Sequence, residues 1–280
     1  MINFNDTTTK VLVLGDSFTF GWLLKNEDTY INLLAKANNH MVFHNAAAGG
    51  WGASDYTAYM ETYCSKINPD IVLIIMNSDD VGRMLRSSLY SYNPTLNLVF
   101  RSKYEVTLRD KLKVLLNAFP LYNFLLENSH LIQLTRSTYL GTNISKFQKI
   151  EKYNSKFFRF GLRNIKSIDY SNKFSAALFK HLKKISTNCE SELRIIYSGV
   201  QKKRNLGIYP TLEFIEYAKG IDFFQNVGIR FIDLTNNPYL IEYQDNSSKY
   251  VIKNDAHPNE AGAKLLFKAI NESGILSNNR

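Results

Sequence analysis

Five short apolar runs alternate along this chain with longer stretches whose apolar residues recur at helical spacing. Uninterrupted apolar runs such as 71–76 are typical of strands that are buried on both faces. The predicted strands are 11–14, 40–45, 71–76, 193–197 and 229–234, and the predicted helices are 29–38, 54–67, 175–187, 212–225 and 259–272. Strands that alternate with helices of this length form βαβ units. The sequence therefore predicts an α/β protein with three α/β/α layers around a mainly parallel five-stranded sheet.

The segment 83–172 interrupts this alternation, because it contains no convincing strand. Apolar residues recur at helical spacing in 111–119 and 121–135, with Pro120 at the break between them. A structureless loop of this length would be unusual in a compact domain. We therefore expect one domain over residues 1–280 that carries a helical insertion at 83–172, as additional core or as a cap over the substrate.

Positive charge is concentrated in the middle of the chain. Residues 83–205 contain 23 Lys and Arg and 7 Asp and Glu, a net charge of +16, whereas the remainder carries −7 of the total of +9. A solvated helical surface is the simpler explanation, and an anionic glycan, phosphorylated carrier or membrane surface facing the insertion is the alternative. Since no helix-turn-helix, zinc-finger or stacking motif accompanies the charge, we expect no nucleic-acid partner.

The two cysteines, Cys64 and Cys189, form no CxxC motif. Such usage predicts neither a disulfide framework nor a zinc site and favours a reducing compartment. The first ten residues are polar, and no apolar run approaches the roughly 20 residues that span a membrane. We therefore expect a soluble, cytoplasmic protein without stable membrane insertion.

Neither a metal nor a cofactor is indicated by the sequence. His40 and His44 are the only histidines at close spacing, and no carboxylate neighbours them on their predicted strand. The glycines at 49–52 have neither the dinucleotide-binding nor the P-loop spacing. We expect a protein without metal or cofactor.

Polar segments follow three predicted strands, and a fourth lies near the C-terminus. They are 15–17, 45–52, 77–80 and 254–262. Ligands bind at the carboxyl edge of open α/β sheets. The sequence around Ser17 alone agrees equally well with a helix-capping residue and with a nucleophile. The polar residues 77–80 could cap the helix that follows them. His257 has an acid two residues before it and Pro258 after it, which places it at a helix start.

Together these segments resemble the sequence blocks of the SGNH hydrolase superfamily, the GDSL esterases and lipases. Gly15-Asp16-Ser17 resembles the first block, 45–52 the second, 77–80 the third and 255–259 the fifth, in the family's order. The resemblance covers residues 10–82 and 193–272 and leaves the insertion outside. It implies a flavodoxin-like sheet order.

The resemblance also implies roles for individual residues. Ser17 would be the nucleophile, His257 the general base and Asp255 the acid that orients the imidazole. The backbone N–H groups of Ser17 and Gly50 would hold the oxyanion.

Two positions depart from the family pattern. Asp79 stands where the family usually has an asparagine that donates to the oxyanion, and an ionised carboxylate can only accept hydrogen bonds. Asn77, in a shifted register, is the alternative donor. The acid lies two residues before His257, whereas the more familiar spacing of three would reach Asn254.

The resemblance implies a carboxylic ester hydrolase that forms an acyl-enzyme on Ser17. We expect an O-acyl ester substrate, acetyl on a carbohydrate, with the basic insertion favouring an anionic sugar. An O-acyltransferase, lipase or thioesterase on the same fold is the alternative, and aromatic residues of the insertion keep a lipid substrate open. A non-catalytic binding module with an impaired oxyanion hole is the alternative from another class, although such a module has no reason to keep Ser17, Asp255 and His257.

Overall fold

The computed structural model describes residues 8–87, 89–102, 168–199 and 210–277. The chain divides into two compact units, residues 1–101 with 164–280, and residues 102–163. Only Ser102 of the second unit is among the described residues. The helices predicted at 111–119 and 121–135, and with them most of the predicted insertion at 83–172, lie outside the described residues. A single domain with a cap therefore stays a prediction.

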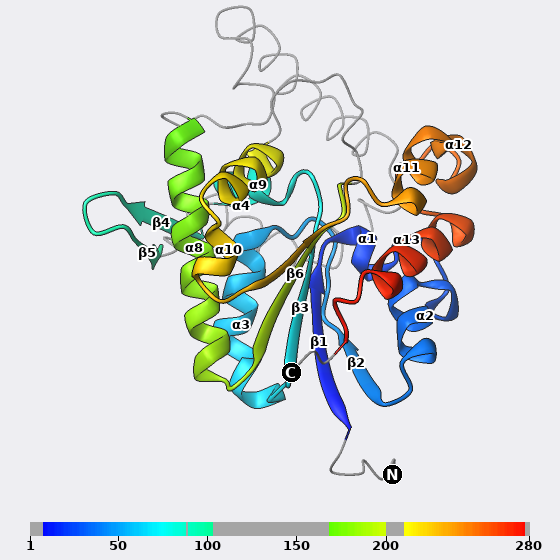
Figure 1. Cartoon of the computed structure of the whole chain (residues 1–280), viewed down its shortest axis with the longest axis horizontal. Helices are drawn as coiled ribbons and strands as arrows, with labels where there is room; N and C mark the ends of the chain where they lie inside the picture. Colours follow the sequence, from blue (N-terminus) through cyan, green and yellow to red (C-terminus); the bar gives the residue numbers. More distant parts are fainter. Residues whose placement is uncertain (1–7, 88, 103–167, 200–209, 278–280) are drawn as a thin grey trace, which may run out of the picture. The chain divides into compact units, whose positions relative to one another are not determined.

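A parallel five-stranded sheet forms the centre of the first unit (Figure 1). Its order is β2-β1-β3-β6-β7, and every neighbouring pair is parallel. The strands are β1 (Thr9–Gly15), β2 (Met41–Asn45), β3 (Ile71–Met76), β6 (Glu192–Tyr197) and β7 (Arg230–Asp233). All five coincide with the predicted apolar runs, so the predicted sheet is confirmed.

Helices cover both faces of this sheet, which gives the predicted three layers (Figure 1). Alternate residues of a strand point to opposite faces, so Leu12 and Leu14 pack with one set of helices and Val11 and Val13 with the other. The first set is α3 (Ala53–Ile67), α8 (Ile168–Asn188), α9 (Pro210–Gly220) and α10 (Phe223–Asn226). The second is α2 (Tyr30–Ala37), α11 (Pro238–Asp245) and α13 (Glu260–Glu272). No helix among the described residues is long and apolar enough to cross a membrane.

The expectation that 83–172 contains no strand is wrong at its beginning. After α4 (Asp80–Ser87), the strands β4 (Tyr90–Asn93) and β5 (Leu98–Arg101) form an antiparallel hairpin. Tyr92 stacks on Phe174 of α8, and the carboxamide oxygen of Asn93 accepts hydrogen bonds from two backbone N–H groups of the turn. The alternation of tyrosines with polar residues before an Asn-Pro turn was the missed signal.

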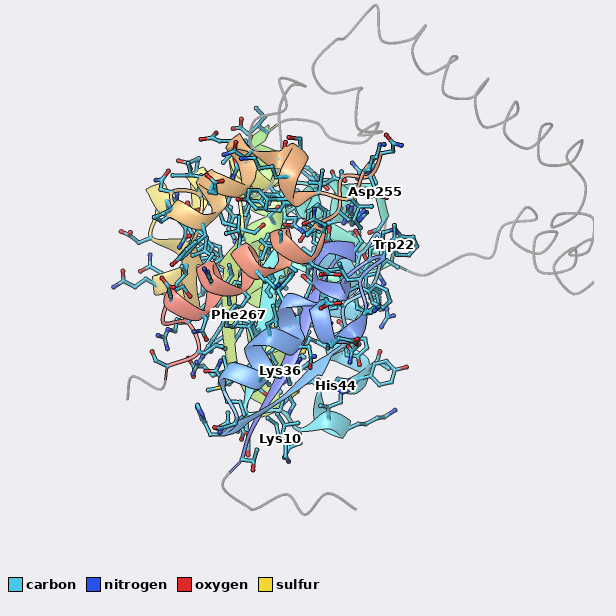
Figure 2. The ribbon with its side chains drawn as sticks, turned by 90° about the vertical axis from the view of Figure 1, so that its right-hand side faces the viewer. Lys10, Trp22, Lys36, His44, Asp255 and Phe267 are labelled. Carbon is cyan, nitrogen blue, oxygen red and sulfur yellow. A yellow bond between two sulfur atoms is a disulfide. The ribbon has the colours of Figure 1, made fainter. Side chains whose placement is uncertain are left out.

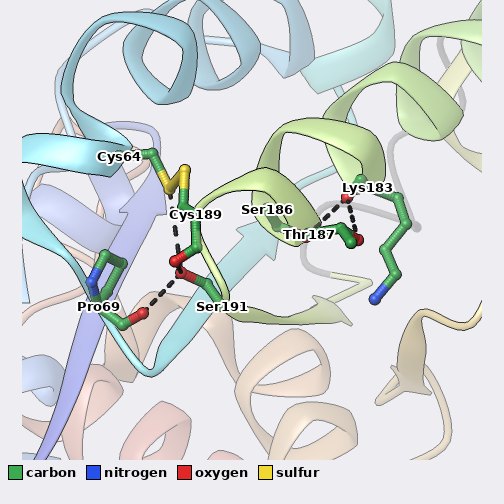
Figure 3. Close-up of a disulfide and its surroundings, with 7 residues drawn as sticks. All are labelled: Cys64, Pro69, Lys183, Ser186, Thr187, Cys189 and Ser191. Atoms are coloured by element: carbon green, nitrogen blue, oxygen red, sulfur yellow. Dashed lines mark hydrogen bonds between the residues drawn. A yellow bond between two sulfur atoms is a disulfide. The ribbon is translucent and has the colours of Figure 1, made fainter.

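A disulfide joins Cys64 to Cys189, which corrects the expectation from the sequence (Figure 3). Cys64 lies near the end of α3 and Cys189 directly follows α8, with their Cα atoms 6.0 Å apart. The packing of α3 against α8 brings together two residues that are 125 positions apart in the sequence. The cysteine-based argument for a reducing compartment is thereby lost, and a cytoplasmic location stays a prediction without it.

Reducing this disulfide is expected to lower the melting temperature, because the bond closes a long loop in the unfolded chain. In the chain-entropy account a loop of this length contributes about 5 kcal/mol. Thermal unfolding with and without dithiothreitol measures the effect. Unreduced protein should show no reactive thiol after denaturation, and two free thiols together with an unchanged melting temperature would contradict the bond.

Candidate active site

Ser17 lies where β1 meets the short helix α1 (Ser17–Phe20), at the carboxyl edge of the sheet. Gly15 permits this junction, since a Cβ there would lie 2.2 Å from the Thr19 hydroxyl oxygen. The carboxylate of Asp16 caps α1 by accepting a hydrogen bond of 2.9 Å from the Phe18 N–H. Asp16 is thus the cap, and the hydroxyl of Ser17 is directed elsewhere.

The Ser17 hydroxyl lies 2.7 Å from Nε2 of His257. Nδ1 of the same ring contacts the Asp255 carboxylate, which also accepts a hydrogen bond of 2.8 Å from the His257 backbone N–H. The structure therefore brings Ser17, His257 and Asp255 into consecutive contact, although they come from opposite ends of the chain.

A tight turn before α13 holds His257 and Asp255 in place. Ile252 donates to the His257 carbonyl and Asp255 donates to the Ile252 carbonyl, both at 2.9 Å. Asn254 adopts the left-handed conformation, with φ 64°, within this turn. Asn259 caps α13 by accepting from the Gly262 N–H at 3.0 Å. The two-residue spacing of Asp255 and His257 is therefore built into the turn, and Asp255 rather than Asn254 contacts the ring.

The charge state of Asp255 follows from these contacts. Hydrogen bonds from the backbone N–H and then the ring of His257 hold the pKa of the Asp255 carboxyl below its usual value. An ionised carboxylate beside Nδ1 favours the tautomer that carries its proton there. Nε2 then faces the Ser17 hydroxyl as a hydrogen-bond acceptor, which is the arrangement a general base requires.

The glycine loop after β2 lies against Ser17. The Ala48 N–H donates to the Gly15 carbonyl at 3.2 Å, and a Cβ on Gly49 would lie 4.0 Å from the Ser17 Cβ. Gly50 has φ 81°, a left-handed conformation that glycine adopts without strain. Gly52 packs so closely on the start of α4 that a Cβ would come within 2.5 Å of the Asp80 carbonyl oxygen. The loop therefore has a fixed path beside the serine.

Asp79 and Asn77, the two side chains that the sequence offered as donors to the oxyanion, both interact with other side chains. The Asp79 carboxylate pairs with Arg86 at 2.7 Å and with Nε of Arg83 at 3.3 Å. Asn77 donates to the Asp16 carboxylate at 2.7 Å, and its carboxamide oxygen accepts from the Ser198 hydroxyl. Asn77 thereby links the segments that carry Asp16 and Ser198, whereas Asp79 pairs only with arginines of α4 in these contacts.

Arg83, which the sequence did not single out, connects three loops of the site. Its Nη1 donates at 2.9 Å to the carboxylate of Asp16 and at 2.9 Å to the carbonyl of Trp51, and its Nε pairs with Asp79. The Arg83 guanidinium thus contacts three segments of the site, which carry Ser17, the glycines of 49–52 and Asp79. The available sequence signal is the pair of aspartates three and four residues before Arg83, a spacing that would place them beside it on a helix.

A second carboxylate, Asp80, lies fully buried beneath Asp16. It accepts hydrogen bonds from the Tyr56 hydroxyl at 2.8 Å and the Asn77 N–H at 3.0 Å. Burial, and then the charge of Asp16, raises the pKa of the Asp80 carboxyl well above its usual value. Within the described residues, no group of three or more His, Cys, Asp and Glu could hold a metal ion.

No protein-family model matches the chain, and no curated protein matches it in sequence. Solved structures with a similar fold do exist. The esterase EstA from Pseudoalteromonas sp. matches with TM-score 0.52 and 12% identity over 95% of this chain and 96% of its own. A G-D-S-L family lipolytic protein from Veillonella parvula has TM-score 0.50 and 12% identity over 98% of this chain and 100% of its own.

A third solved structure is Axe2, an acetyl-xylooligosaccharide esterase from Geobacillus. It matches with TM-score 0.51 and 12% identity over 98% of both chains. At such low identity the similarity defines the fold and not the activity. The chain therefore has the α/β fold of the GDSL lipolytic proteins and esterases. This confirms, at the level of fold, the resemblance to the SGNH hydrolase superfamily.

Proposed function

We propose that this protein is a serine esterase that hydrolyses an O-acyl ester through an acyl-enzyme on Ser17. The observation that carries the proposal is the contact of 2.7 Å between the Ser17 hydroxyl and His257 Nε2, with Asp255 on the other ring nitrogen. An activated nucleophile has this signature: a base within hydrogen-bond reach and a third group that orients the base.

The reaction proceeds in two halves. As the Ser17 Oγ bonds to the acyl carbon, its proton moves to His257 Nε2, and Asp255 stabilises the resulting imidazolium. When the ester C–O bond breaks, His257 gives that proton to the leaving alcohol oxygen. Water then adds to the acyl carbon and leaves its proton on His257. Cleavage of the Oγ–C bond returns the proton to Ser17 and releases the acid.

The developing oxyanion is held in this proposal by the backbone N–H groups of Ser17 and Gly50. Their support is the position of the glycine loop against Ser17 and the left-handed Gly50. Removing one such donor costs roughly 3 to 4 kcal/mol in other hydrolases. The proposal does not need the side chains of Asp79 or Asn77: the Asp79 carboxylate pairs with Arg86, and Asn77 donates one carboxamide N–H to Asp16.

The proposed substrate is an acetyl ester of a carbohydrate, with an anionic sugar favoured by the positive charge of residues 83–205. One protein of the same fold acts on acetyl-xylooligosaccharides. The support for a sugar is therefore an analogy of fold together with charge. An O-acyltransferase would use the same acyl-enzyme and pass the acyl group to a hydroxyl instead of water.

Wild-type protein is expected to release acetate from p-nitrophenyl acetate and from an O-acetylated oligosaccharide. Its rate of hydrolysis of p-nitrophenyl esters should fall as the acyl chain lengthens. Chromatography of products with and without a sugar acceptor separates hydrolysis from transfer. A preference for long acyl chains would contradict the acetyl assignment. Transfer that dominates over acid release would make the protein an acyltransferase.

A further inference from the structure

The turn after α1 is anchored to the carbonyl of Ser17. The backbone N–H groups of Gly21 and Trp22 both donate to this carbonyl, at 3.2 and 3.1 Å. The Leu24 N–H closes the turn on the Gly21 carbonyl at 3.0 Å. The position of Trp22 is therefore fixed relative to Ser17 by the backbone itself.

This turn carries strain that burial does not explain. Leu23 adopts φ 62°, a left-handed conformation that is rare for a residue with a branched side chain, although Leu23 is 66% exposed. Strained backbone of this kind is concentrated at ligand sites, where the surrounding structure holds it. Leu23 directly follows Trp22, whose ring neighbours that of His257.

The indole of Trp22 lies next to the imidazole of His257 and is open to solvent. The two ring centroids are 6.1 Å apart, and Trp22 is 44% exposed. Phe18 supports the imidazole at 5.1 Å and is itself buried. Figure 2 shows Trp22 and Asp255 at the same edge of the ribbon. An exposed apolar ring therefore borders the side of the site where His257 lies.

The chemistry of the proposed esterase decides which part of a substrate reaches this ring. His257 Nε2 must give its proton to the leaving oxygen, so the alcohol part of the ester lies within reach of His257. The carbonyl oxygen points instead toward Gly50. Because Trp22 neighbours the His257 ring, we expect it to lie nearer the alcohol part of a bound ester than its carbonyl oxygen.

We propose that Trp22 is a binding subsite for the alcohol part of the ester, and that this alcohol is a sugar ring. The proposal rests on the esterase function proposed above. An indole presents a flat apolar face with negative π-density, which suits the C–H face of a pyranose, while the sugar hydroxyls remain in water. Trp22 thereby becomes a residue that determines specificity for the alcohol.

Substrates that share the acetyl group but differ in the alcohol test this subsite. Trp22→Ala should lower kcat/KM for an acetylated methyl glycoside by about tenfold, mainly through KM. It should change kcat/KM for ethyl acetate less than twofold, and Trp22→Phe should retain most of the glycoside activity. Phe20→Ala is the matched control, since Phe20 is an aromatic residue of α1 that is 50% exposed. It should affect neither ester.

Equal losses with both esters would overturn the subsite, because Trp22 would then merely support His257. A loss that grows with the length of the acyl chain would overturn it in favour of a lipid substrate. If wild-type protein hydrolyses neither ester, the proposed function itself fails and the subsite with it. If it hydrolyses both and Trp22→Ala leaves their ratio unchanged, only the subsite fails.

Binding without turnover gives a second readout. The chain has two tryptophans, Trp22 and Trp51, so the double variant Ser17→Ala, Trp51→Phe leaves Trp22 as the only indole. Its fluorescence should shift and saturate as the acetylated glycoside is added, and it should not respond to ethyl acetate. An unchanged spectrum at saturating glycoside would contradict the proposal.

Discussion

Asp255→Asn is expected to lower kcat for p-nitrophenyl acetate by about 10⁴-fold while leaving KM nearly unchanged. The carboxamide can still accept from the His257 backbone N–H, so the turn is preserved. Being neutral, it stabilises the imidazolium less than the carboxylate does. The backbone N–H and Nδ1 of His257 face the same Asp255 oxygen, so a carboxamide that flips to donate to Nδ1 favours the tautomer with its proton on Nε2 at the expense of the backbone hydrogen bond. Steady-state kinetics, with the melting temperature as a check on folding, measure the effect.

Asn254→Gly is the matched control for this prediction. Asn254 occupies the position that the more familiar triad spacing would use, and its φ of 64° suits glycine. Its replacement should change kcat less than a few-fold. A large loss of kcat in Asn254→Gly, together with near-normal activity of Asp255→Asn, would contradict the assignment of Asp255 as the acid of the triad.

Arg83→Met is expected to lower kcat by about 100-fold, because small displacements of loops around reacting atoms have effects of this size. The Trp51 carbonyl next to Gly50 loses its donor, and the buried Asp16 loses its charge partner. Arg83→Lys should recover only part of the activity, since an ammonium lacks the planar fork that reaches three loops. Kinetics below the melting temperature of each variant separate positioning from unfolding.

Arg86→Met provides the control for Arg83. Arg86 lies on the same helix, α4, and pairs with the same Asp79, at 2.7 Å. The charge removed is therefore the same, while the contacts of Arg83 with Asp16 and Trp51 remain. Arg86→Met should keep kcat within a few-fold of wild type. Equal effects of the two variants would mean that only the charge at Asp79 matters and would contradict a positioning role for Arg83.

The sequence was sufficient to predict the sheet, because its strands are short apolar runs that local patterns reveal. The central strands β1, β3 and β6 are largely buried, whereas the edge strands β2 and β7 are partly exposed. The meeting of Ser17, Asp255 and His257 was predicted from the resemblance to the SGNH hydrolase sequence blocks, because Asp255 and His257 follow no strand of the sheet and lie in the turn before α13. The hairpin at 90–101 was missed because its tyrosines alternate with polar residues and form no apolar run.

Contacts between distant segments could not be predicted from local patterns. The disulfide depends on how α3 packs on α8, which spacing in the sequence does not encode. The role of Arg83 depends on a single side chain reaching two other loops. The partners of Asp79 explain why a carboxylate is tolerated beside the site, although the sequence alone suggested an impaired oxyanion hole.

The most direct test of the central claim is the reaction of the protein with a fluorophosphonate, followed by intact-mass measurement and peptide mapping. An activated serine should take up one phosphonyl group, located on Ser17. Labelling should be absent in Ser17→Ala and strongly slowed in His257→Ala. Failure of the folded wild-type protein to react, or labelling that persists in Ser17→Ala, would contradict the assignment of Ser17 as the nucleophile.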